Sequence, residues 1–88
     1  MNKQVNKKST TKDELYLLKL YEMAVKLGGP EEEVDRVAVG RAIGQNDKGI
    51  NAIVRHLLQA NFVKKGADEA IFLTPHGLKL VEQIAKER

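Results

Sequence analysis

The chain has 88 residues, which is enough for one domain around one hydrophobic core. It contains no cysteine, which excludes disulfide bonds and thiolate metal sites and favours a reducing compartment such as the cytoplasm. No apolar run approaches the roughly 20 residues needed to span a bilayer, so the sequence predicts no membrane segment.

The formal net charge of +3 is unevenly distributed. Residues 1–12 carry four lysines and no acid, whereas residues 13–88 carry eleven basic and twelve acidic side chains. We therefore expect residues 1–11 to form a disordered basic tail and residues 12–88 to form the folded domain. Such a tail can grip phosphates without sequence preference, or it can serve only to keep the protein in solution.

The first helix is expected to begin at Thr11, because Glu14 lies three residues later and completes a capping-box pattern. It should end at Gly28-Gly29-Pro30. Tyr16 falls off the main apolar stripe and is expected at the surface, under the tail or in a dimer contact. The apolar residues at helical spacing are Leu17, Leu20, Tyr21, Ala24 and Leu27.

Two further helices follow a short extended link at Val34. The first of them should run from Arg36 to Ile43, capped by Asp35 and ended by Gly44. The next follows the polar turn Gln45-Asn46-Asp47 and runs to about Ala60. The predicted core residues of these two helices are Val39, Ile43, Ile50, Ile53, Val54, Leu57 and Leu58, with Val37 or Ala38 assisting.

The C-terminal third predicts a β-hairpin and a last helix. Asn61 suits the left-handed conformation that closes a helix. Residues 62–65 and 70–73 are expected to be strands joined by the loop 66–69, with Phe62 and Phe72 in the core. Thr74 should cap the last helix, with proline at its first position. The apolar face of that helix is Leu78, Val81 (or Leu80) and Ile84.

The stretch from Val34 to Leu80 resembles the winged helix-turn-helix domain of bacterial and archaeal transcription regulators. The matching residues are Val39, Ile43 and Gly44, then Ile50, Val54 and Leu57, then Phe62-Val63-Lys64-Lys65 and Ile71-Phe72-Leu73-Thr74-Pro75-His76-Gly77. The resemblance implies a mainly α fold with a small β-hairpin: a three-helix core with a helix-turn-helix, a two-strand wing and a C-terminal helix.

The resemblance also implies double-stranded DNA as the partner, with the third helix inserted in the major groove. The implied base-reading residues are Asn46, Lys48, Asn51, Ala52 and Arg55. Asparagine can pair bidentately with adenine, and arginine with guanine. The turn residue Gln45 is expected to hold a phosphate. Lys64 and Lys65 on the first wing strand either contact phosphates or protect an exposed strand from edge pairing.

Three features differ from the family pattern. Asp47 stands at the start of the expected recognition helix, Gly49 lies in its first turn, and Asp68 and Glu69 make the wing tip acidic. They leave open an alternative, a winged-helix module for protein–protein interaction. In that case the wing tip and the cluster from Glu31 to Asp35 would engage a basic partner. A homodimer is a further alternative left open, through the first helix with Tyr16 exposed or through the last helix.

No catalytic group is predicted. Ser9 is the only serine and lies in the tail, so a serine nucleophile is not expected. His56 and His76 are isolated histidines without cysteine, which predicts neither a metal site nor a cofactor.

Overall fold

The computed structural model describes residues 10–87 and contains seven elements in this part of the chain. They are α1 (Lys12–Leu27), β2 (Val34–Asp35), α2 (Arg36–Ala42), α3 (Asp47–Gln59), β3 (Val63–Lys65), β4 (Ala70–Leu73) and α4 (Pro75–Glu87). A mainly helical domain with a small hairpin is therefore confirmed. Of the tail expected over residues 1–11, residues 1–9 lie outside the described residues. No helix in the described part is long and apolar enough to cross a membrane.

The β-sheet has three strands, which corrects the expected two-strand hairpin. Val34 and Asp35 form β2, which pairs antiparallel with β4, Val34 lying opposite Ile71. On the other side of β4, β3 pairs with Val63 opposite Leu73, so the order is β2-β4-β3. A two-residue strand is too short to produce an alternating pattern, and the sequence therefore predicted only an extended link.

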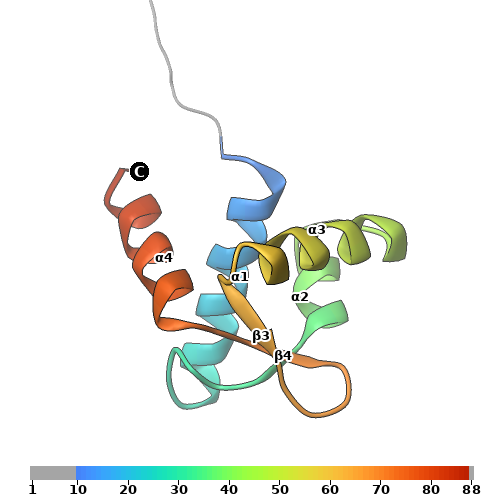
Figure 1. Ribbon diagram of the computed structural model, residues 1–88, viewed down its shortest axis with the longest axis horizontal. Coiled ribbons are helices and arrows are strands. Elements are labelled where there is room, and N and C mark those ends of the chain that lie inside the picture. Colours follow the sequence, from blue (N-terminus) through green and yellow to red (C-terminus); the bar gives the residue numbers. More distant parts are fainter. Residues whose placement is uncertain (1–9, 88) are drawn as a thin grey trace, which may run out of the picture.

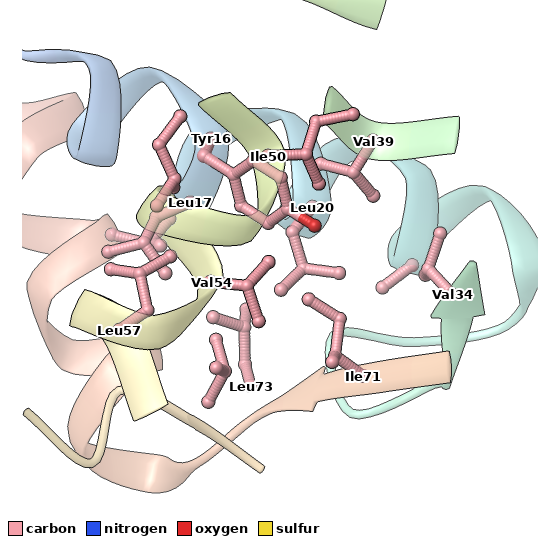
Figure 2. Close-up of a cluster of buried hydrophobic side chains, with 14 residues drawn as sticks. Tyr16, Leu17, Leu20, Val34, Val39, Ile50, Val54, Leu57, Ile71 and Leu73 are labelled. Atoms are coloured by element: carbon pink, nitrogen blue, oxygen red, sulfur yellow. The ribbon is translucent and has the colours of Figure 1, made fainter. Parts of the chain in front are cut away.

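In Figure 1, α1 lies between α4 on one side and α2 with α3 on the other, and the sheet lies below them. The buried side chains of α1, α3 and β4 meet in one core (Figure 2). At Gly40 a Cβ would collide with the side chain of Ile50, so α2 and α3 approach closely there. This contact fixes the position of α3 on the domain.

Tyr16 is fully buried, so the expected surface position, and with it a dimer contact through an exposed Tyr16, is wrong. Figure 2 shows its ring among the core side chains. Its hydroxyl donates a hydrogen bond of 2.6 Å to the carbonyl of Arg36. Because α2, α3, α4 and β4 all contact α1, the buried face of this helix is wider than a single stripe. Leu27 was counted in that stripe but is 63% exposed at the end of the helix.

Strand alternation decides which aromatic residues reach the core. Ile71 and Leu73 point inward and are buried, whereas Phe72 lies on the opposite face of β4 and is only half-buried. The expectation that Phe72 belongs to the core is therefore wrong. Phe62 and Leu58 are partly buried and pack against the core from its edge.

The predicted helix ends are confirmed in their local chemistry. Thr11 and Glu14 form a reciprocal capping box, with both side chain to backbone bonds at 3.1 Å. Asp35 caps α2 by accepting from the amide of Val37 at 2.9 Å. Asn61 adopts the left-handed conformation with φ 65° after α3. These caps set where α1, α2 and α3 begin or end.

Candidate nucleic-acid interface

The outward face of α3 carries four of the residues that the sequence singled out. Lys48, Asn51, Ala52 and Arg55 follow at i, i+3, i+4 and i+7, which places them on one side of the helix. All except the half-buried Ala52 are exposed. The buried residues of α3 lie on its opposite side and are Ile50, Ile53, Val54 and Leu57. The structure therefore brings these four predicted site residues together as one row.

A groove of about 520 Å³ lies between α3 and the β3–β4 hairpin. Its apolar wall includes Val54, Leu58 and Ile71. Arg55 from α3 and Lys65 from β3 also line it, and neither makes an ion pair or side-chain hydrogen bond with any residue from 10 to 87. In Figure 1, α3 lies above the loop of this hairpin. The groove is thus an open channel with unpaired cations on both sides.

The two strand lysines do not act together. Lys65 lies opposite Ile71 in the sheet and shares its face, whereas Lys64 lies opposite Phe72 on the other face. Lys65 therefore lines the groove beside α3, and Lys64 points away from it. The structure separates this predicted pair.

Arg36 was missed by the sequence analysis, although it joins the groove to the core. Its Nη2 donates to Oδ1 of Asn51 at 3.0 Å, and its Nε donates to Oε1 of Glu69 at 2.9 Å. Its backbone amide donates to the carbonyl of Glu69 at 2.9 Å, and its own carbonyl accepts from Tyr16. The sequence contained one indication of this role. A cation in the first turn of a helix interacts unfavourably with the helix dipole, so an arginine at the start of α2 points to a compensating partner.

Two of the acids beside the row of Lys48, Asn51, Ala52 and Arg55 form ion pairs with arginines. Arg41 donates to Asp47 at 2.8 Å, and Arg36 holds Glu69. Asp68 at the loop is exposed with φ 53° and has no ion pair with a described residue. Of the acids that separated this sequence from the family pattern, two are therefore neutralised by arginine neighbours.

The start of α3 is organised by Asn46 and Gln45. Asn46 is the N-cap residue, and its Oδ1 accepts from the amide of Gly49 at 2.9 Å. A Cβ at position 49 would collide with the side-chain oxygen of Gln45, so Gly49 gives room for that side chain. The amides of Asp47 and Lys48 have no acceptor within the helix. Among the described residues, these two amides at the start of α3 have no hydrogen-bond acceptor.

Part of the acidic cluster between Glu31 and Asp35 has a role inside the fold. Oε1 of Glu33 accepts from the amide of Ala67 in the hairpin loop at 3.1 Å, and Asp35 caps α2. Glu31 and Glu32 are exposed. The cluster therefore supports the hairpin as well as facing solvent.

The histidines lie apart from the row. His56 lies 3.4 Å from Asp13 of α1, and His76 stacks on Phe62 with ring centroids 4.7 Å apart. Among residues 10–87 there is no group of three or more histidine and acidic side chains that could hold a metal ion.

No family model, curated protein or solved structure matches this chain.

Proposed function

We propose that this chain is a winged-helix domain that binds double-stranded DNA and acts as a small transcription regulator. The observation that carries the proposal is the distribution of charge around α3. Lys48, Arg55 and Lys65 are exposed and unpaired among the described residues, while the neighbouring Asp47 and Glu69 are each held by an arginine. The surface therefore offers three unpaired cations to a polyanion, and of the nearby acids only Asp68 is left without an arginine partner among the described residues.

In this proposal α3 enters the major groove and the β3–β4 hairpin is the wing. The 13 residues of α3 span about 20 Å, and the B-DNA major groove, about 12 Å wide, admits a helix. Arg55 reads a base edge, Lys48 contacts a base or phosphate, and Lys65 contacts a phosphate beside the groove. Gln45 and the open amides of Asp47 and Lys48 hold another phosphate.

The alternative, a protein-interaction module, has weaker support. Glu33, Asp35 and Glu69 each satisfy a donor inside the domain, so they are less available to a basic partner. Glu31, Glu32 and Asp68 remain for such a partner. Capture of a basic protein together with an absence of duplex binding would favour this alternative.

The test is duplex binding by fluorescence anisotropy across a salt series. The double variant K48A/R55A should bind a mixed-sequence duplex about tenfold or more weakly, and its salt slope should be smaller by up to about one, since only Lys48 is placed at a phosphate. The matched control is K79A/K86A, which removes two exposed charges from α4. The control should lose less than about twofold in affinity. Equal losses in the two double variants, or no duplex binding by the wild-type protein, would refute the proposal.

A further inference from the structure

We propose that Arg36 determines base specificity by fixing the side-chain amide of Asn51, so that the outward face of α3 selects guanine over adenine. This inference rests on the DNA-binding function proposed above. It adds the chemical class of the base edge that α3 reads. It also assigns a positioning role to Arg36, which lies on α2 and outside the row of exposed residues on α3.

The orientation of the Asn51 amide follows from the chemistry of its partner. A guanidinium group has five N–H donors and no acceptor, so only the carbonyl oxygen of an amide can face it. Nη2 of Arg36 lies 3.0 Å from Oδ1 of Asn51. The NH2 group of Asn51 must therefore point away from Arg36. The exposed position of Asn51 on α3 leaves that donor available to a ligand.

Arg36 is itself restrained, which makes the arrangement persistent. Its guanidinium is shared between Asn51 and Glu69, and its side chain is only 26% exposed. Its backbone is bonded on both sides, to the carbonyl of Glu69 and to the buried hydroxyl of Tyr16. The backbone bonds hold the residue from which the side chain extends, and the bond from Nε to Glu69 restrains the guanidinium itself.

Bidentate recognition of adenine needs both atoms of an asparagine amide. The oxygen accepts from the adenine N6 amino group while the NH2 donates to N7. With its oxygen turned to Arg36 and one of the two lone pairs of that oxygen engaged there, Asn51 presents its NH2 group outward. Asn46 is similarly restricted, because its oxygen accepts from the amide of Gly49. The oxygens of both asparagines are thus turned toward partners inside the domain, which disfavours the adenine pairing that the sequence suggested.

The whole polar row on α3 then presents donors. Lys48 and Arg55 carry donors only, and Asn51 adds a third donor between them along the helix. Guanine exposes two acceptors, O6 and N7, in the major groove, whereas adenine and cytosine each expose an amino donor. A row of donors matches guanine and is repelled by the amino groups. The expected target is a site with guanine at the base pair that Asn51 contacts.

Selection of binding sequences from a randomised duplex library, read by sequencing, tests this inference. The wild-type protein should enrich guanine over adenine at one position by about fivefold or more. In R36M the Asn51 amide can rotate, so the guanine preference there should vanish or change to adenine. Two controls should keep the wild-type preference. K79M and K86M each remove one exposed cation from α4, away from Arg36 and Asn51.

The possible outcomes distinguish a failure of this inference from a failure of the proposed DNA-binding function. Failure of the wild-type protein to enrich any duplex overturns both. Duplex binding with the same base preference in R36M and wild type overturns the inference alone, as does an adenine preference in the wild-type protein. If circular dichroism shows that R36M is unfolded, N51D decides. This variant keeps an oxygen that accepts from Arg36 but lacks the NH2 group of Asn51, so it must lose the guanine preference. A retained preference refutes the inference.

Discussion

The hydroxyl of Tyr16 is a polar atom placed deep in an apolar core. Its cost of burial is offset because it donates to the carbonyl of Arg36 at 2.6 Å. That bond also connects α1 to the first residue of α2, from which the Arg36 side chain reaches Asn51. One core tyrosine thus helps to position a side chain in the candidate interface.

Replacing Tyr16 with phenylalanine should cost about 0.5–1.5 kcal/mol of unfolding free energy at neutral pH, through loss of this bond. It should also change the response to alkali. Burial raises the pKa of Tyr16 above its usual range, so the folded state keeps the phenol protonated after the unfolded chain begins to ionise. The wild-type stability contributed by this group is complete below about pH 10 and falls as the pH rises further.

Urea unfolding at several pH values between about 7 and 11 measures this difference. The stability gap between wild type and Tyr16→Phe should narrow above about pH 10, the ordinary pKa of a phenol. Tyr21→Phe, which leaves Tyr16 in place, should retain the wild-type decline. A constant gap across the whole range would show that Tyr16 does not titrate differently in the two states.

At the scale of elements, α4 is docked onto the chain that leaves α3. Thr74 donates through its hydroxyl to the carbonyl of Asn61 at 2.7 Å, and the same oxygen accepts from the amide of Gly77 at 2.9 Å. The Thr74 amide donates to the carbonyl of Phe62 at 3.1 Å. A Cβ at Gly77 would collide with that carbonyl. The first turn of α4 therefore lies directly against the end of the α3 connection.

Gly77→Ala should destabilise the domain by about 1–3 kcal/mol, because the new methyl group has to displace backbone. Thermal unfolding followed by circular dichroism measures the effect. Gly29→Ala is the matched control, since its Cβ would meet only a side-chain oxygen of Glu31 at an ordinary 3.6 Å. If both variants lose the same stability, the close approach at Gly77 is not the cause.

The elements that the sequence predicts well are those whose ends are set by local chemistry. The Thr11 capping box, the left-handed Asn61 and the Thr74-Pro75 start of α4 each depend on neighbours within a few residues. β2 and the burial of Tyr16 depend on partners far along the chain. Periodicity within one segment carries no information about such partners, and these were the features missed.

The candidate site likewise has features that local spacing predicts and features that depend on distant partners. The exposed row on α3 follows from helical spacing and could be read from the sequence. The pairing of Glu69 with Arg36 could not, because the two residues are 33 positions apart. Nor could the separation of Lys64 from Lys65, which requires knowing which face of β3 meets α3. The charge of a surface thus depends on tertiary neighbours as much as on composition.

At the scale of the whole molecule, the net charge and the candidate interface belong to different parts of the chain. Residues 13–88 carry one more acid than base, so under the proposed function we expect long-range attraction to DNA to come from the four lysines of residues 1–12. Under the same proposal we expect local contact with DNA to come from the unpaired cations around α3. These two contributions predict different responses to truncation and to substitution.

Deleting residues 1–9 tests this division. The deletion removes Lys3, Lys7 and Lys8 but keeps Thr11, whose side chain caps α1 at Glu14. Each phosphate contact contributes about 0.9 to the slope of log affinity against log salt, so the slope should fall by up to about 2.7. The base preference should be unchanged, because α3 keeps its row. If the deletion abolishes binding while K48A/R55A has no effect, only the tail contacts DNA, and α3 cannot be the helix that reads it.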